Sequence, residues 1–437
     1  MQKLFKLKEH GTDVKTEMIA GITTFLAMAY ILAVNPLILS STGMDQGALF
    51  TATAVAAIIG TLCMAFFANY PVALASGMGL NAFFASVVAG GISWQIVLTA
   101  ILIEGLIFIL LTLFKFREAI INAIPKNLKL AITAGIGLFI AFIGFQTGLG
   151  FGIGTNFMTP QIILAFAGLL VMGIMLYFKV KGAILWGILI TYVLGVGAQA
   201  IGWYVPDPSI GVFSLYPSAI FSAPPSIASI FFKFDFSGAW KLGIDFLVIC
   251  FAFLMVDMFD TIGTLVGVAS QANLLDEKGQ LPNAKGALMA DAVGTTAGSM
   301  LGTSTVTSYI ESAAGVEVGG RTGLTSVFTA AMFVLALFFS PVFLAVPAFA
   351  TAPALIIVGL MMMRSVKEID FTDYTIAIPA FLTIVLMPIL SSIADGMMFG
   401  FISYLILQLI NKKGKDLHPM MYIIVALFLL KLIIPLL

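Results

Sequence analysis

The sequence predicts an all-α polytopic membrane protein. Of its 437 residues, 60% are hydrophobic and only 10% are charged, and the mean hydropathy of +1.10 is far above that of a soluble domain. Apolar stretches long enough to cross a bilayer as helices recur along the whole chain. Lys and Arg gather in alternate connections between these stretches, as expected for connections that face the cytoplasm.

The composition argues against several classes of protein. The 21 basic and 21 acidic residues balance, so no basic surface indicates nucleic-acid binding. Cys63 and Cys250 both lie in apolar runs, which indicates neither a disulfide framework nor a metal cluster. The sequence contains no motif that pairs a nucleophile with a base and no phosphate-binding loop. We therefore expect no enzymatic activity, no cofactor and no bound metal.

The chain divides into about fourteen predicted spans, some short or interrupted, because a helix needs about 20 apolar residues to cross the hydrocarbon core. Their approximate ranges are 17–39, 49–68, 72–90, 94–114, 128–148, 160–178, 182–203, 243–270, 286–302, 304–318, 322–345, 350–363, 372–391 and 394–411. A further apolar stretch over 419–436 either crosses the membrane or lies shallow in it.

The basic residues agree with this topology. If residues 1–16 form a cytoplasmic tail, the connections on the same side contain nearly all the remaining Lys and Arg, whereas the outer side has only Lys233 and Lys241. The tail lacks the apolar core and cleavage site of a signal peptide. We expect a multi-pass protein of the plasma membrane with a cytoplasmic N-terminus. The inner basic residues are Lys115, Arg117, Lys126, Lys129, Lys179, Lys181, Lys278, Lys285, Arg321, Arg364, Lys367, Lys412, Lys413 and Lys415.

The segment 204–242 is the natural boundary between two halves of seven predicted spans each. Because seven is odd, a second half that repeats the first must be inverted in the membrane. Weak sequence similarity supports a repeat: 56–61 (AAIIGT) aligns with 290–295 (ADAVGT), and 185–194 aligns with 398–407.

The third and tenth spans do not suit an uninterrupted helix. Residues 70–84 (YPVALASGMGLNAFF) place a Pro, two glycines and a Ser in mid-membrane, and 302–315 open on the β-prone, hydroxyl-rich GTSTVTSY. In transporters built from inverted repeats, a pair of interrupted helices at corresponding positions marks the substrate site. We expect the site where these segments meet.

A polar stripe runs along the eighth span. Asp257, Asp260, Thr261 and Thr264 fall at i, i+3, i+4 and i+7, so they share one helical face. A carboxylate inside a membrane is costly unless it is protonated, paired or facing water, so both acids are candidate site residues. The alternative is a stripe that only holds neighbouring helices together, and this alternative is stronger for Asp257 than for Asp260.

Glu311 and Asn81 lie in the two interrupted spans. Glu311 follows GTSTVTSY where a short helix should begin, and the helix dipole there favours an anionic group. A plain helix cap is the alternative. Asn81 follows SGMGL; its amide offers a donor and an acceptor, and the backbone near Gly79 can approach a ligand directly.

Other polar and aromatic residues have two interpretations each. Glu104 and Asp291, also in apolar surroundings, are either proton-relay groups or structural partners of neighbouring helices. Four aromatic residues close to the site segments either stack on a planar ligand or fill the core: Phe25, Tyr30, Phe83 and Phe84.

Six sequence blocks, in order, resemble a known family. They are GITTFLAMAYILAVNP (21–36), YPVALASGMGLNAFFA (70–85), FREAIINAIPKNLKLAITAGIGLFIAFIG (116–144), DMFDTIGTLVGVASQAN (257–273), LGTSTVTSYIESAAGVEVGGRTGLTS (301–326) and TAPALIIVGLMM (351–362). With these blocks the chain resembles, over nearly its whole length, the hypoxanthine/guanine (AzgA-like) purine permeases of the nucleobase/cation symporter-2 superfamily.

The resemblance implies fourteen spans in two inverted repeats of seven, with a short strand in each of spans 3 and 10 that pair with one another. It also implies a core domain, and a gate domain through which two copies form a homodimer. The implied parts are the core over 17–115 and 243–345, the gate over 116–203 and 346–411, an extracellular connection over 204–242 and a C-terminal apolar segment over 412–437.

By motif position, the substrate residues of the family carry over to Asp260, Glu311 and Asn81, with Gly79 and Thr264 beside them. Related uracil and xanthine permeases have a His where this chain has Thr264.

Because this chain has Thr264 in place of that His, the acids Glu311, Asp260 and Asp257 are left as candidates for proton coupling. His10 and His418 lie outside the implied core.

The resemblance and the residues together predict a secondary active transporter that imports purine nucleobases by proton symport with alternating access. Hypoxanthine and guanine are the expected substrates, with adenine a further candidate, and a proton is favoured over sodium. A facilitator and an anion carrier on the same fold are the alternatives. Two acids at the site argue against an anion carrier, because an anion favours a cationic or neutral pocket.

Overall fold

The computed structural model describes residues 4–114, 124–147, 157–207, 213–272, 274, 281–414 and 417–433. These residues are mostly helical, as predicted, with one pair of short strands. The first half contains α1 (Val14–Met28), α2 (Ile31–Ser40), α3 (Gln46–Phe67), β1 (Leu74–Ser76), α4 (Met78–Ala89), α5 (Trp94–Phe114), α7 (Lys126–Thr147), α8 (Pro160–Tyr177) and α9 (Ala183–Ala200). The second half contains α10 (Phe236–Leu242), α11 (Ile244–Gln271), α12 (Ala284–Leu301), β2 (Val306–Ser308), α13 (Ser312–Glu317), α14 (Gly323–Ala336), η2 (Leu337–Phe339), α15 (Ser340–Leu344), α16 (Ala348–Met362), η3 (Met363–Glu368), α17 (Tyr374–Ile389), α18 (Ile393–Ile410) and α19 (Pro419–Ile433).

Ten helical segments in the described part of the chain are long and apolar enough to cross a membrane, so the protein is a multi-pass membrane protein. This count takes α1 with α2, α14 with α15, and α16 with η3 as one segment each. They correspond to ten of the predicted spans. The third, ninth, tenth and thirteenth predicted spans contain shorter or more polar helices, and the total of fourteen stays a prediction. Four of the basic residues used to orient the chain lie outside the described residues: Lys115, Arg117, Lys278 and Lys415.

Two predicted spans are interrupted in ways that the sequence analysis did not anticipate. The first span is two helices, α1 and α2, separated by Ala29 and Tyr30. The eleventh passes from α14 through the 3₁₀ turn η2 into α15. Pro341 explains this second break, because it has no N–H to donate to the carbonyl of Leu337.

Aspartates begin several helices outside the apolar spans. The carboxylate of Asp13 accepts the N–H of Thr16 (2.9 Å) at the start of α1, and Asp235 accepts that of Gly238 (2.7 Å) at the start of α10. Such bonds satisfy N–H groups that have no partner within the helix. The bond from Thr16 also lowers the pKa of the Asp13 carboxyl below its ordinary value. Helix α1 therefore begins before residue 17, where the first span was predicted to start.

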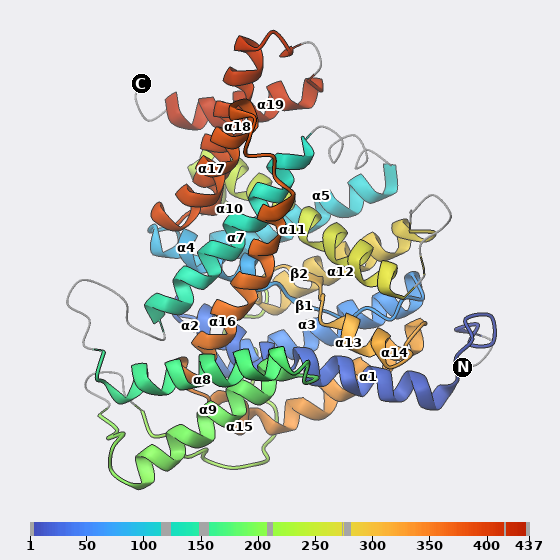
Figure 1. The fold of residues 1–437 in the computed structure, drawn as a ribbon, viewed down its shortest axis with the longest axis vertical. Helices are drawn as coiled ribbons and strands as arrows, with labels where there is room; N and C mark the ends of the chain where they lie inside the picture. The colour runs from blue at the N-terminus through green and yellow to red at the C-terminus, as the bar shows by residue number, and fades with distance from the viewer. Residues whose placement is uncertain are drawn as a thin grey trace.

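The strands expected in spans 3 and 10 are present and pair with one another. β1 and β2 are antiparallel, with Leu74 opposite Ser308, Ala75 opposite Thr307, and Ser76 opposite Val306. Both strands are buried and lie near the centre of the molecule in Figure 1. Segments far apart in the sequence therefore meet in the interior through backbone hydrogen bonds.

Two threonines hold the strands to helices in the same way. The Thr61 hydroxyl of α3 accepts the Leu74 N–H (2.9 Å) and donates to the Leu74 carbonyl (3.0 Å). The Thr295 hydroxyl of α12 does the same for Val306, with both distances 3.1 Å. We call these two arrangements the threonine clamps.

Glycines next to the clamps allow the strands to approach the helices. A Cβ on Gly60 of α3 or on Gly294 of α12 would lie 3.0 Å from Cγ1 of Val306. These glycines precede Thr61 and Thr295 in the two aligned stretches 56–61 and 290–295. The weak sequence similarity thus falls on residues with matching structural roles.

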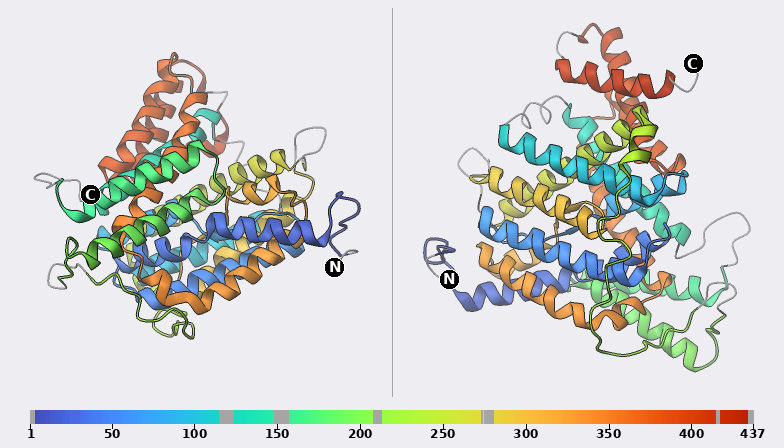
Figure 2. Two further views of the ribbon diagram at one scale, coloured as in Figure 1. Left: turned by 60° about the horizontal axis from the view of Figure 1, so that its bottom comes forward. Right: turned by 180° about the vertical axis from the view of Figure 1, so that it is seen from behind.

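The helices pack in two groups. In the first group, α1 to α5 and α11 to α14 surround the strand pair; in the second, α7 packs on α16 and α17, and α8 packs on α9. In Figures 1 and 2, α18 and α19 (red) lie at one end of the long axis and α8 and α9 (green) at the other. The two groups meet where α7 contacts α4 and α11, and where α16 contacts α2.

The C-terminal helix α19 connects the two groups. Its buried Phe428 packs against Phe251 of α11 (ring centroids 5.8 Å apart) and against Phe401 of α18 (5.9 Å). Because α11 belongs to the first group, and α18 packs on α17 and α7 of the second, one ring contacts both groups.

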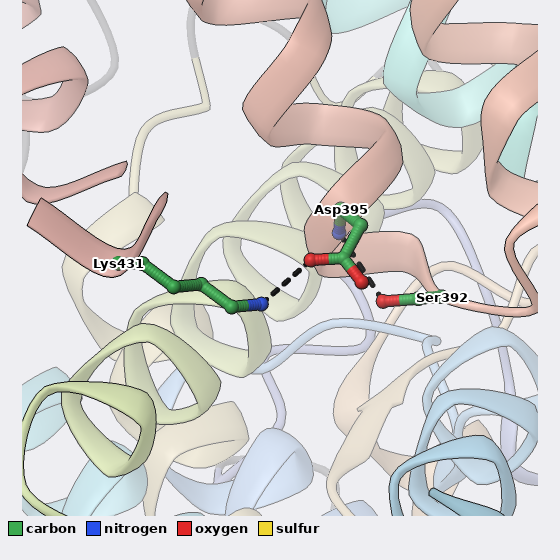
Figure 3. A network of polar contacts seen from close by, with 3 residues as sticks. All are labelled: Ser392, Asp395 and Lys431. Carbon is green, nitrogen blue, oxygen red and sulfur yellow. Dashed lines mark hydrogen bonds and ion pairs between the residues drawn. The ribbon is translucent and has the colours of Figure 1, made fainter. Parts of the chain in front are cut away.

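An ion pair fixes the far end of α19. The Lys431 ammonium lies 2.6 Å from the Asp395 carboxylate of α18, whose own N–H donates to the Ser392 hydroxyl, as Figure 3 shows. Near the start of α19, the Tyr422 hydroxyl donates to the carbonyl of Gly414, just after α18. The end of α19 therefore contacts the start of α18, and the start of α19 contacts the residues after α18, so the two helices run in opposite directions. Whether 419–436 crosses the membrane or lies shallow in it stays a prediction, and residues 434–436 lie outside the described residues.

Candidate functional site

A cavity of about 80 Å³ lies where the two helix groups meet. The first group contributes the turn after α1, the start of α4, part of α11 and the segment from β2 to α13. The second group contributes α7 and α16, whose side chains here are apolar. The lining includes four predicted site residues, Gly79, Asp260, Thr264 and Glu311, and four apolar residues of the second group, Ile136, Ile140, Val358 and Met362.

Glu311 enters the cavity directly before α13. Its Oε1 accepts a hydrogen bond from the Tyr30 hydroxyl at 2.6 Å, and the Tyr30 side chain is fully buried. The Glu311 side chain makes no capping hydrogen bond to α13. The Glu311 carboxylate therefore does not act as a plain helix cap; Tyr30, from the break between α1 and α2, holds it instead.

Asp260 faces the same cavity from α11. Thr264, one turn further along, lies beside it in the lining, and Thr307 of β2 lines the same cavity. Within the described residues, neither Asp260 nor Glu311 forms an ion pair with a Lys, Arg or His. Two acidic side chains therefore line one small cavity without a cationic partner among these residues.

The residues that follow β2 form another part of the wall. The Tyr309 hydroxyl donates to the carbonyl of Ser76 in β1 at 2.5 Å, which ties the end of one strand to the other. Ser308 also lines the cavity, and its buried hydroxyl has no partner among the described residues. The sequence analysis did not identify either residue, because neither hydroxyl-bearing side chain stands out in a stretch as rich in hydroxyls as GTSTVTSY.

The start of α4 provides backbone donors. The first N–H groups of a helix have no partner within it, and in α4 these belong to residues that line the cavity, including Gly79. A Cβ on Gly79 would lie 2.6 Å from Cγ2 of Ile136, and one on Gly77 would lie 2.8 Å from Oγ1 of Thr307. The missing side chains at these two glycines thus let α7 and β2 pack close to the start of α4.

Asn81 does not line the cavity. It is fully buried one turn into α4, and its Oδ1 accepts a hydrogen bond from the Ser76 hydroxyl at 2.8 Å. Ser76 in turn lies 3.4 Å from the hydroxyl of Thr303, which accepts from Asn35. In this structure Asn81 supports the wall from behind, and direct contact of its side chain with a substrate stays a prediction.

The polar stripe on α11 contacts two different neighbours. Asp260 and Thr264 point to the cavity, whereas Asp257 and Thr261 point to α12. Thr261 donates to Asp291 at 2.7 Å, and Asp257 accepts from Thr295 at 3.4 Å. Asp257 is thus set apart from the predicted binding residues, in a second buried cluster with Asp291.

The arrangement is suited to binding a small polar solute. Two acidic side chains, several hydroxyls and the N–H groups of a helix start offer acceptors and donors, and the opposite wall is apolar. Within the residues that the structure describes, no group of His, Cys, Asp and Glu has the arrangement needed to hold a metal ion.

Known proteins similar to this chain are membrane permeases. Residues 15–399 match the sequence pattern of a family described as "Permease family". The chain is 41% identical to the adenine permease AdeP of Escherichia coli, and the similar region covers 99% of this chain and 96% of AdeP. It is 43% identical to the guanine/hypoxanthine permease PbuG of Bacillus subtilis (98% and 99% covered) and 42% identical to PbuO, which bears the same description in that organism (99% and 100%).

A solved structure shares the fold. The transmembrane domain of the cyanobacterial bicarbonate transporter BicA matches with a TM-score of 0.64 at 16% sequence identity, covering 88% of this chain and 97% of that domain. At this identity the similarity concerns the fold alone.

The fold and the sequence matches together define a membrane transporter rather than an enzyme. The chain belongs to this permease family, the nucleobase/cation symporter-2 family that its sequence motifs resemble, and it stands among relatives that are purine permeases.

The close contact between Gly79 and Ile136 gives a first prediction. Replacing Gly79 with Ala should lower the stability of the purified protein by about 1–3 kcal/mol, because the added methyl group overlaps Cγ2 of Ile136. The double variant Gly79→Ala/Ile136→Ala should lose less stability than the sum of the two single losses, because the shortened side chain at position 136 no longer meets the added methyl group, as measured by thermal unfolding in detergent. Additive effects of the two substitutions would contradict the contact.

Proposed function

We propose that the protein imports purine nucleobases together with protons, by alternating access across the plasma membrane. The observation that supports this most directly is the pairing of Asp260 and Glu311 on one small cavity between two helix groups. Relatives 41–43% identical over nearly the whole chain are named for adenine or for guanine and hypoxanthine.

The chemistry of a neutral purine suits this cavity. Hypoxanthine and guanine present N–H groups along their edges, and carboxylates accept such groups in strong hydrogen bonds. We assign this role to Glu311 and Asp260, with Thr264 beside Asp260. The backbone N–H groups near Gly79 would contact carbonyl or ring-nitrogen acceptors, and Ile136 and Val358 would cover the apolar face of the base.

A proton is the coupling ion that this chemistry favours over sodium. A buried charge is costly to carry through the apolar interior, and a proton taken up with a neutral base removes one negative charge from the site. Glu311, Asp260 and Asp257 are the candidates for holding it. Proton and substrate together would then allow the two helix groups to move past one another, because only the loaded state lowers the cost of the change.

The moving parts in this proposal are the two helix groups. We identify the first with a core domain over 17–115 and 243–345, and the second with a gate domain over 116–203 and 346–411 that pairs two copies. The matching threonine clamps at Thr61 and Thr295 support an inverted repeat of seven spans in each half. The N-terminus would be cytoplasmic, and 204–242 would be extracellular.

Replacing Glu311 with Gln tests the assignment of the site. Gln can still accept the Tyr30 hydrogen bond but carries no charge and takes up no proton, so concentrative uptake of labelled hypoxanthine into cells should be lost at equal expression. Glu317→Gln is the matched control, because Glu317 lies exposed in the same helix. Wild-type accumulation by the Glu311 variant would disprove the assignment.

A competition panel tests the substrate class. In cells without their own nucleobase permeases, unlabelled hypoxanthine, guanine or adenine should reduce uptake of a labelled purine, whereas bicarbonate and sulfate should not, because two acidic side chains disfavour a bound anion. The measurement is initial uptake with each competitor in excess. Competition by uracil alone, or by bicarbonate, would refute purine selectivity. Uptake that does not respond to the proton gradient would favour a facilitator.

A further inference from the structure

A second group of acidic side chains lies behind the cavity, between helices of the first group. Glu104 of α5, Asp257 of α11 and Asp291 of α12 are each fully buried. Helix α5 packs on both α11 and α12, which places Glu104 near Asp257 and Asp291, and Thr261 donates to Asp291 at 2.7 Å. None of the three lines the substrate cavity.

A close contact between Glu104 and Asp257 is favourable only when one of them holds a proton. Two ionised carboxylates have four acceptor oxygens and no hydrogen to share, so they repel one another. Neither oxygen of Glu104, nor Oδ1 of Asp257, has a donor among the other described residues. The contact becomes a hydrogen bond only when one of the two acids is protonated.

The charged groups around this contact do not neutralise it. Glu104 lies near Asp257, Asp291 and the thiol of Cys250, and Asp257 is about one turn from Asp260 on its own helix. Within the described residues, neither Glu104 nor Asp257 forms an ion pair with a cation. Each proton that such a buried site takes up removes one negative charge, so its protonated form is less costly than its fully ionised form.

Thr295 connects these acids to the strand that supports the pocket wall. Its hydroxyl accepts the Val306 N–H, and it faces two acceptors for its single proton: the Val306 carbonyl at 3.1 Å and Oδ2 of Asp257 at 3.4 Å. The hydroxyl cannot donate fully to both. An ionised Asp257 competes for this proton more strongly than a protonated one, because hydrogen bonds to charged acceptors are stronger.

The other clamp has no such competition. Thr61 makes the same two hydrogen bonds to Leu74 of β1, and both distances, 2.9 and 3.0 Å, involve the strand backbone. In the described part of the chain, no hydrogen bond joins the Thr61 hydroxyl to a carboxylate. The two halves of the fold thus contain the same clamp, and only the second half places acids against it.

We propose that Glu104, Asp257 and Asp291 form a proton-binding site that is separate from the purine pocket and acts on it through Thr295. This inference rests on the proposed proton symport. When the site is protonated, the Thr295 hydroxyl donates to Val306 and holds β2, with the pocket wall from Thr307 to Glu311, in place. When the proton leaves, the hydroxyl turns to Asp257 and the hold on β2 weakens. Proton occupancy and purine affinity are thereby coupled without contact between proton and purine.

Replacing Glu104 with Gln separates proton coupling from binding. In proteoliposomes with an inward gradient of one pH unit, the wild type should concentrate a purine about tenfold for each proton carried. Glu104→Gln removes one ionisable group and puts an amide N–H donor beside Asp257 at every pH, so the variant should exchange internal for external purine within about twofold of the wild-type rate but accumulate none.

Paired substitutions in the clamps give the matched control. Thr61→Val and Thr295→Val each remove one hydroxyl that bonds a strand, so both should lower thermal stability to a similar degree. Only Thr295→Val should abolish the pH dependence of purine affinity, measured by equilibrium binding between pH 5 and pH 8. These variants also test the proposal if Glu104→Gln does not fold.

Three results would overturn this inference: wild-type accumulation by Glu104→Gln, loss of exchange as well as accumulation in a folded Glu104→Gln protein, or equal changes in the pH dependence for the two threonine variants. Accumulation driven by sodium alone would also overturn it. If the wild type itself fails to accumulate purine with a pH gradient, the proposed function fails instead, whatever the variants do.

Discussion

Backbone pairing between β1 and β2 is the interaction on which the rest of this structure depends. Inside a bilayer, an unsatisfied backbone N–H or C=O group costs several kcal/mol, so a spanning segment that leaves the helical form needs a partner. Strands of three residues persist here because each supplies partners to the other, and because the two threonine clamps satisfy further groups. The pairing also brings the start of α4 and the residue before α13, Glu311, to one place.

The two halves of the chain use this scaffold differently. Both have an interrupted span, a glycine that admits a strand and a threonine that clamps it, but the acids are concentrated in the second half. Asp260 and Glu311 face the cavity, Asp257 faces the clamp at Thr295, and Asp291 accepts a hydrogen bond from Thr261. In our proposal, the substrate contacts and the control of β2 therefore involve different neighbours of one short strand.

Much of this was predictable from the sequence, because a polar residue in an apolar span is costly and therefore conspicuous. Asp260 and Glu311 were singled out on this basis, whereas the interrupted spans, and the site where they meet, were predicted from the Pro and glycines of 70–84 and the β-prone GTSTVTSY. The separation of Asp257 from Asp260 was not: consecutive residues on a helix are turned by about 100°, so a single polar stripe is wide enough to face two neighbours. The position of Asn81 behind the cavity wall and the hydrogen bond from Tyr30 to Glu311 were also missed, because they depend on tertiary packing that no periodicity encodes.

The central claim is that purine and proton bind this protein together. Calorimetric titration of the purified protein with hypoxanthine, in buffers that differ in ionisation enthalpy, tests it most directly by counting the protons taken up on binding. The account predicts proton uptake with each purine bound near neutral pH, seen as a binding heat that changes from buffer to buffer. A heat that is the same in every buffer would contradict it.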